Sequence, residues 1–565
     1  MWFILLLFGF FVLALALGYA TVLVRGTGNL LGVALLCGFG FALGGILLAV
    51  FIHWLCCWRN FKRFLFGLAC FITLVALFYA EEDWRGKHAW EEFKREWEAK
   101  GERFDRASVV PPPVPDEQNF ALSPIVFTSY GQLLTRDGKF IPWAARDTNF
   151  VNRLQMSIGG PQPWPTNGDW RVAQAGDLSG WQQYYRALAA KTNLFPVAAQ
   201  GQSPADDVLH ALSKYSSTIE ELREAGKLRD SRFPLEYDKD DPAAMLLPHL
   251  APLKSCAQVL QLRALAELQN DQSGRALADV KLILRLTDSI QTEPILISQL
   301  VRVMLVNLAL QPIWEGLAEH RWSDAQLVEL EGELAKTDFL AAGELALRGE
   351  RIMGVEIIDY LRHLPYRQRV RTLSAFSINL RLEDEIFLCL GPAGWMDQSK
   401  LRISRFSLRY YSPIINVDRQ TVSPVAMRNA DAAFPLESGS SGGGDLFERL
   451  LLPAVGSVVK KLAFGQNAVN LARTASALER YRLARREYPE SLDVLAPQFI
   501  AKLPHDVING QPLHYRRTSD GQFVLYSVGW NETDDGGEVA LDGPFGKSGN
   551  VNINKGDWVW RYPQK

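Results

Sequence analysis

The sequence predicts a membrane-anchored, mainly α-helical protein with three transmembrane helices, an ectodomain of helical hairpins and a small C-terminal α+β module. Three observations carry this prediction. Apolar runs occupy residues 2–24, 30–58 and 64–80. Apolar side chains then recur with helical periodicity through most of the chain. Only the C-terminal stretch alternates apolar and polar residues as strands do.

The three apolar runs are predicted to be transmembrane helices, which form a first domain over residues 1–80. A membrane helix needs about 20 mostly apolar residues. The first run contains no charge, and the second contains only the titratable His53. The third run, bounded by Arg63 and Glu81, is near the lower length limit. The first run lacks a basic leading segment and is longer than a signal-peptide core, so we expect it to be retained.

The charges between the runs predict the orientation. The first and second runs are joined by a loop with one basic residue, Arg25. The second and third are joined by a link with Arg59, Lys62 and Arg63. Basic residues near spans stay preferentially in the cytoplasm. We therefore expect a multi-pass protein of the bacterial inner membrane, with residues 81–565 forming the bulk of the chain in the periplasm.

Glycines in the second run suggest a partner. Small residues let membrane helices approach closely, which predicts a homo-oligomer through the transmembrane helices. The alternative is that glycine is simply common in such helices. The glycines are Gly32, Gly38, Gly40, Gly44 and Gly45.

Composition restricts the classes of protein to which the chain can belong. The formal net charge of −2 predicts no nucleic-acid surface. Beyond the apolar runs the chain has only Cys256 and Cys389, which form one disulfide or stay free. There is no CxxC motif and no zinc-finger spacing.

Residues 81–118 predict a stalk helix and a proline-rich spacer. The spacer contains VVPPPVP, which stiffens a chain into an extended segment. One apolar stripe follows the helix, and it either packs on its own domain or binds a partner. The stripe consists of Trp90, Phe93, Trp97 and Phe104.

The next two segments differ in regularity. Residues 119–180 are rich in Gly, Pro, Trp and Asn, so we expect irregular structure with short strands near Ile125–Phe127 and Lys139–Trp143. Residues 181–435 are predicted to be a helical domain, followed by a Gly/Ser linker at 436–446.

Within the helical domain, residues 256–270 and 275–290 predict an antiparallel helix pair, similar in architecture to tetratricopeptide hairpins. Residues 295–311 are apolar nearly all round and predict a central core helix. Ser203 and Ser323 begin capping sequences for two further helices.

Residues 447–565 predict a long helix followed by an α+β module. The segments Leu513–Arg517 and Gln522–Val528 alternate and flank Ser519-Asp520-Gly521, which is a hairpin signal. The module resembles the C-terminal domain of the type II secretion major pseudopilins, in which the same motifs occur in the same order. The matching residues are Tyr488-Pro489, Ser491-Leu492, Leu495, Leu503-Pro504, Asp506, Gly510, Pro512, Tyr515, Tyr526-Ser527 and Gly529.

The pseudopilin resemblance implies calcium in the loop after the hairpin. Calcium prefers carboxylate, amide and carbonyl oxygens on a turning loop. In this chain the expected calcium ligands are Asn531, Asp534, Asp535 and Asp557. The alternative is that the loop is a solvated acidic turn without a metal. The chain departs from the family because the module follows some 450 other residues without a short basic leader, so we do not expect a pilus-like fibre.

The longer stretch from residue 64 to the ending KGDWVWRYP resembles a family of membrane-anchored proteins of Verrucomicrobia-type bacteria, which implies an anchor and no particular activity.

No catalytic residue is assigned. The sequence has no GxxxxGK[ST], GxSxG or HExxH motif. We interpret a His/Asp group as satisfying hydrogen bonds, and an acidic group, whose alternative is a cation site, as an exposed turn. We expect a non-enzymatic binding or scaffolding protein with an envelope protein partner; the alternatives are an exported hydrolase and a ligand sensor. The His/Asp group consists of His505, Asp506 and His514, and the acidic group of Glu236, Asp238, Asp240 and Asp241.

Overall fold

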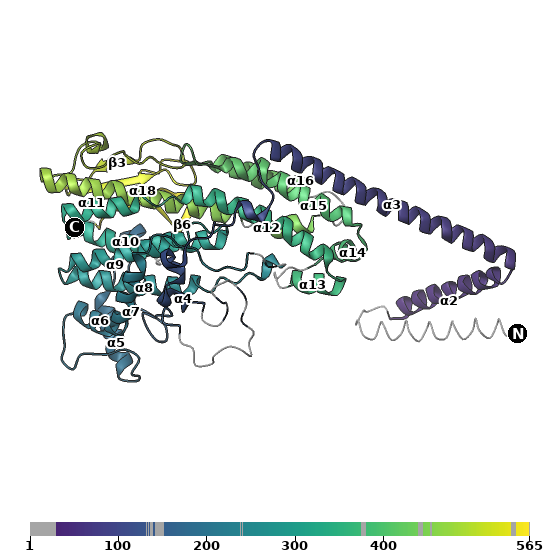
Figure 1. Cartoon of the computed structure of the whole chain (residues 1–565), viewed down its shortest axis with the longest axis horizontal. Helices are drawn as coiled ribbons and strands as arrows, with labels where there is room; N and C mark the ends of the chain where they lie inside the picture. Colours follow the sequence, from purple (N-terminus) through teal and green to yellow (C-terminus); the bar gives the residue numbers. More distant parts are fainter. Residues whose placement is uncertain are drawn as a thin grey trace. The chain divides into compact units, whose positions relative to one another are not determined.

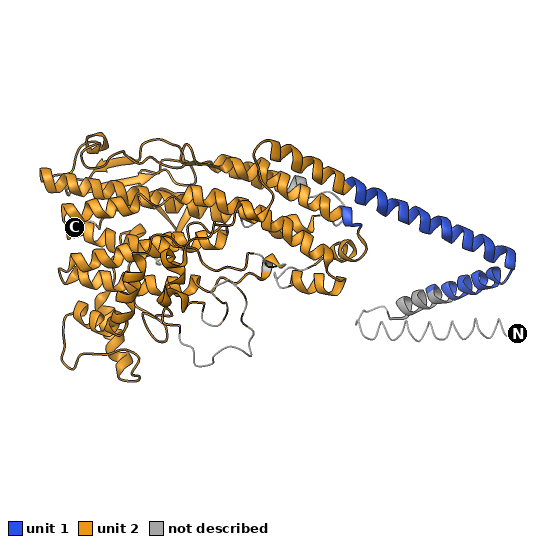
Figure 2. Ribbon diagram, viewed as in Figure 1, with its two compact units in different colours: residues 1–85, 392–394 blue, residues 86–391, 395–565 orange. Residues whose placement is uncertain are grey.

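A computed structural model shows a mainly helical protein with a small sheet-containing C-terminal part (Figure 1). By internal contacts the chain divides into two compact units, Met1–Arg85 with Pro392–Gly394, and Gly86–Gly391 with Trp395–Lys565 (Figure 2). The structure describes residues 30–130, 133, 135, 139, 141, 152–237, 239, 241–374, 380–438, 445–452, 455–543 and 550–563.

The first unit contains α2 (Leu30–Leu55) and the beginning of α3 (Trp58–Ala99). The first apolar run lies outside the described residues. Among those that are described, two helices are long and apolar enough to cross a membrane, α3 and α10 (Leu296–Ala318). The apolar part of α3 buries none of its side chains, whereas α10 is mostly buried. Three transmembrane helices therefore remain a prediction, and α10 has the burial of a core helix.

The stalk stripe packs on its own domain. Trp90, Phe93 and Phe104 form a small hydrophobic cluster with side chains of α12 (Phe339–His363) and α15 (Ala393–Phe406). The rings of Trp90 and Phe104 meet edge to face at 5.6 Å, and the Arg351 guanidinium lies 4.8 Å from the Phe104 ring. Of the two alternatives for this stripe, the structure shows the intramolecular one.

The helical body is built around α10. Its apolar surface is buried against neighbouring helices, because residues such as Leu305, Ala309 and Ile313 are fully inaccessible. The predicted pair of helices is present as α8 and α9. Ser203 and Ser323 cap α6 and α11 as predicted, with Gln326 completing the capping box. The helices are α5 (Leu178–Ala189), α6 (Pro204–Leu212), α7 (Ser216–Gly226), α8 (Leu250–Gln269), α9 (Ser273–Asp288), α11 (Asp324–Leu334) and α12 (Phe339–His363).

One strand prediction is wrong. Residues Ile125–Phe127 belong to a helical turn, α4 (Pro124–Phe127), because proline fits the first position of a helix and Ser123 precedes it. Most of Lys139–Trp143 lies outside the described residues. The remaining elements before the C-terminal part are α13 (Tyr366–Ser374), α14 (Leu382–Leu390), α15 (Ala393–Phe406), β1 (Ile415–Asn416), β2 (Thr421–Val422) and α16 (Pro424–Ser438).

In the C-terminal part a long helix packs against a small antiparallel sheet of order β3-β4-β7. The predicted hairpin is confirmed, with Tyr515 opposite Leu525 and Gly521 at a φ of 79° in its turn. Strands β5 and β6 form a separate pair. The elements are α17 (Leu446–Leu451), α18 (Val455–Arg485), β3 (His514–Arg517), β4 (Phe523–Ser527), β5 (Val539–Asp542), β6 (Asn550–Gly556) and β7 (Trp558–Arg561).

A buried polar network joins α18 to the sheet. The Asn467 amide nitrogen donates to Asp506 Oδ1 at 3.0 Å and to Ser527 Oγ at 2.9 Å. Asp506 also accepts the backbone N–H groups of Ile508 at 2.9 Å and Val528 at 3.0 Å. All three side chains are inaccessible to solvent. Asp506 of the LP-x-D motif and Ser527 of the YS-x-G motif therefore have a structural role.

Replacing Asp506 should destabilise the fold. Asp506→Ala leaves an amide and two N–H groups without their acceptor, and we expect a loss of about 3 kcal/mol in the free energy of unfolding. Urea unfolding of the full chain followed by tryptophan fluorescence measures it. Glu487→Gln, which neutralises an exposed carboxylate of the same part, is the control. A loss below about 1 kcal/mol would contradict the role given to the network.

Candidate functional site

An open groove of about 640 Å³ lies on the helical body between α7, α9 and α11. Its floor is aliphatic and its rim is charged. Gly274 also lines the groove but is exposed to solvent, and no atom lies within 4 Å of where its Cβ would stand. The floor residues are Gly226, Leu277, Ala278 and Leu282; the rim residues are Arg223, Lys227, Lys281, Arg285, Glu329, Glu333 and Lys336.

The rim charges are paired. Lys281 on α9 reaches Glu329 on α11 at 2.9 Å, which links the two walls of the groove. Lys336 pairs with Glu333 at 2.7 Å. The Arg285 guanidinium donates to the backbone carbonyl of Gly226 at 3.1 Å, at the end of α7. Exposed pairs of this kind add little stability. They give the rim alternating charges of both signs.

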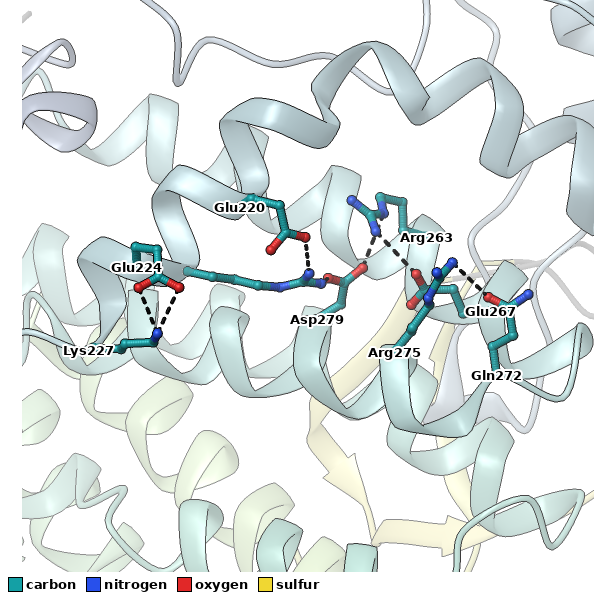
Figure 3. Close-up of polar contacts among 9 residues, drawn as sticks. Glu220, Glu224, Lys227, Arg263, Glu267, Gln272, Arg275 and Asp279 are labelled. Atoms are coloured by element: carbon teal, nitrogen blue, oxygen red, sulfur yellow. Dashed lines mark hydrogen bonds and ion pairs between the residues drawn. The ribbon is translucent and has the colours of Figure 1, made fainter.

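A buried ionic cluster lies beside the groove and joins three helices (Figure 3). Asp279 on α9 is inaccessible and pairs with Arg223 of α7, which also lines the groove. Arg263 of α8 lies 3.3 Å from Asp279 and 3.1 Å from Glu267. Glu220 binds Arg223 from the solvent side at 2.5 Å. This cluster holds α7, α8 and α9 in one arrangement, because each buried charge would be costly without its partner.

Burial changes the protonation of this cluster. It raises the pKa of Glu267 to about 7, an effect that the nearby Asp279 charge strengthens and Arg263 opposes. Burial also raises the pKa of Asp279 against the attraction of Arg263 and Arg223.

A second buried polar group was not predicted from the sequence. His249 is inaccessible, stacks on the Phe233 ring at 4.2 Å, and places Nε2 2.9 Å from Glu293 Oε1. Ser298 donates its hydroxyl to Glu293 and not to the histidine. In a catalytic Ser-His-Asp triad the serine hydroxyl donates to the histidine, so the arrangement of Ser298, Glu293 and His249 is not that of a triad. No pattern in the sequence marks these residues, because they come from three separate segments.

The side chains of the His/Asp group do not converge on one site. His505 Nε2 lies 3.1 Å from the Arg419 carbonyl, and Asp506 belongs to the buried network. His514 stacks on Tyr526 and places Nδ1 3.2 Å from Asp534. Their interpretation as structural residues fits these contacts.

The acidic turn is only partly described. Glu236 pairs with Lys239 at 3.0 Å, while Asp238 and Asp240 lie outside the described residues. Cys256 is buried and Cys389 is exposed, and both thiols are free.

The four residues of the calcium prediction lie around one loop. Asn531 donates to Asp535 at 2.8 Å, and Asp534 accepts from the Tyr526 hydroxyl at 3.0 Å. Asp557 accepts the backbone N–H of Gly537 at 2.6 Å. Within the described ranges, no group of three or more His, Cys, Asp or Glu side chains is arranged to hold a metal ion. Calcium therefore stays a prediction that rests on the resemblance.

Stability should depend on pH through Glu267. Its pKa rises from 4.5 to about 7 on folding, so the folded protein holds a proton that the unfolded chain releases. The stability that this proton contributes is complete below the unfolded pKa of 4.5 and is lost as the pH rises through the folded pKa of about 7. We expect the melting temperature of the wild type to fall more steeply between these two pH values than that of Glu267→Gln. Glu220→Gln, an exposed member of the cluster, should keep the wild-type slope; equal slopes for all three would contradict the assignment.

Calcium binding is tested by adding or removing the ion. A ligand at 100 times its dissociation constant stabilises the folded state by about 2.7 kcal/mol. The calcium prediction requires the wild type to melt at a higher temperature in calcium than in chelator, and Asp534→Ala to show no such difference. Identical wild-type melting curves in both buffers would end the prediction.

No protein-family model, curated protein or solved structure matches this chain. The pseudopilin and Verrucomicrobia-type resemblances accordingly rest on the sequence motifs alone.

Proposed function

We propose that this protein is a membrane-anchored, non-enzymatic binding or scaffolding protein of the bacterial envelope. In this proposal the groove between α7, α9 and α11 holds a segment of a polypeptide partner. The observation that carries the proposal is the groove itself, which combines an aliphatic floor with a rim of mostly paired charges.

The anchor is supported by α3. Its apolar part is long enough to cross a bilayer, and its large side chains are exposed, among them Phe66 at 73% and Leu74 at 65%. Exposed apolar surface costs about 25 cal/mol per Å² in water and nothing comparable in lipid. The basic residues Arg59, Lys62 and Arg63 favour a cytoplasmic start of α3 and a periplasmic helical body.

The groove suits a polypeptide better than a small charged ligand. Its volume falls in the range of about 300–1,000 Å³ that is common for ligand sites. Five of its seven charged rim residues are basic and two are acidic. Ion pairs already engage four of the five basic side chains, so little free positive charge is left to hold a small anion. An amphipathic helix or extended segment would place apolar anchors on the floor and polar groups against the rim.

The hydrolase alternative is best placed in a second groove. This groove holds Glu356, Asp359 and His363 of α12. Glu356 is held by Arg106 through two bonds of 2.9 and 2.8 Å, and Asp359 is held by Lys400 at 2.8 Å. A general base needs a free carboxylate or imidazole within reach of its substrate. These pairings engage both carboxylates, and His363 Nδ1 lies 2.8 Å from the Asp359 carbonyl, which favours binding over catalysis by a carboxylate base.

The binding proposal is tested by filling the groove. A phenylalanine at Gly274 starts in open space, because no atom lies within 4 Å of its Cβ, and its ring would add bulk to the lining of the groove. Gly332 on α11 is a matched control, because it too is a helical glycine with nothing within 4 Å and it does not line the groove.

We expect a photo-crosslinker at Ala278 to capture a specific protein in native membranes. Gly274→Phe should abolish this product and Gly332→Phe should retain it, with unchanged melting temperatures for both. Retention of the product by Gly274→Phe would exclude the groove as the binding surface, and no product in the wild type would contradict the scaffold function.

A further inference from the structure

Helix α14 carries an exposed apolar stripe. Leu382, Ile386 and Leu390 stand at i, i+4 and i+8, so they share one face, and they are 74%, 51% and 63% exposed. The opposite face is buried through Phe387 and Leu388. Among the described residues after Ala99, no other helix has more than one exposed large apolar side chain. Isolated exposed apolar residues are ordinary, but a contiguous stripe marks an interaction surface.

The neighbouring helix α13 is basic. It contains three arginines and no acidic residue. Arg369 donates to the carbonyl of Leu388 at 2.9 Å and so joins α13 to α14. Arg367 and Arg371 are exposed, one helical turn apart. An apolar face beside arginines is typical of helices that lie on an anionic membrane surface. Glu383 and Glu385 also border the stripe, so burial of apolar surface is the main attraction.

The length of the chain limits how far the end of α14 can lie from Asp83 of α3. The Gly394 N–H donates to Asp83 Oδ1 at 2.7 Å, and Asp83 follows the third apolar run by three residues. Leu390 precedes Gly394 by four residues, and four residues span at most about 14 Å. If α3 crosses the bilayer, this tether holds the C-terminal end of α14 near the lipid headgroups.

We propose that α14 lies in the lipid–water interface of the membrane that α3 crosses. Leu382, Ile386 and Leu390 enter the acyl-chain region, and Arg367 and Arg371 face the headgroup phosphates. This proposal rests on the membrane anchor proposed above. It gives the helical body a second attachment to the membrane, which fixes its orientation in a way that a single helix cannot.

The native Cys389 provides the test, because it is exposed on the same face of α14. A full-length chain without the cysteines at 37, 56, 57 and 70 is spin-labelled at Cys389 and placed in phosphatidylethanolamine–phosphatidylglycerol nanodiscs. The buried Cys256 stays unlabelled. We expect the label to collide more often with oxygen, which concentrates in lipid, than with a water-soluble nickel chelate. Leu382→Glu with Ile386→Glu should reverse that order.

Two further label positions, each in a chain with Cys389→Ser, separate the possible failures. Phe71→Cys in α3 reports the anchor, and Val328→Cys on α11, which is 46% exposed, reports water. A label in lipid at 71 but in water at 389 overturns the docking and leaves the anchor intact. A label in water at 71 overturns both. Shielding of Cys389 from both reagents would mean a protein contact and also overturn the proposal.

Discussion

The packing of α10 against α18 is the contact on which the rest of the second unit depends. Gly465 makes it possible, because a Cβ at this position would stand only 3.0 Å from a methyl group of Val303. Polar contacts extend this packing. Trp314 of α10 donates to the carbonyl of Arg561 at the end of β7, and His320, two residues after α10, lies 3.0 Å from Glu479 of α18. The C-terminal sheet is thereby built onto the helical body, and both belong to one compact unit.

Helix α10 is apolar enough to cross a membrane, but it carries a buried arginine whose partners lie within the helical body. Arg302 is the single charged side chain in the first half of α10, and it is inaccessible. Its guanidinium donates to the Thr287 carbonyl and to Gln299, and lies 5.0 Å from the Phe339 ring. Burial lowers its pKa to about 10, which leaves it charged at neutral pH. An arginine with these partners sets the register of α10 against the end of α9, which a lipid-facing helix would not need.

Local signals in the sequence predicted local structure well. Ser203 and Ser323 cap helices as their motifs indicate, and the Ser-Asp-Gly turn joins a hairpin. The strand expected at Ile125–Phe127 failed because a proline at a helix start outweighs three β-favouring residues. The groove could not be predicted, since its walls come from segments about a hundred residues apart. The partners of Asp279 lie on two other helices, so no spacing rule brings them together.

The ionic cluster beneath the groove has a consequence for how a partner would bind. Asp279, Arg223 and Arg263 already hold α7 and α9, which both line the groove, together with α8 behind them. A partner would therefore meet side chains that have lost their conformational freedom during folding, and association would carry a smaller entropic cost. Binding of the partner would give a negative heat-capacity change, because it covers the aliphatic floor of the groove. Affinity would then change little with ionic strength, since the rim charges are satisfied before the partner arrives.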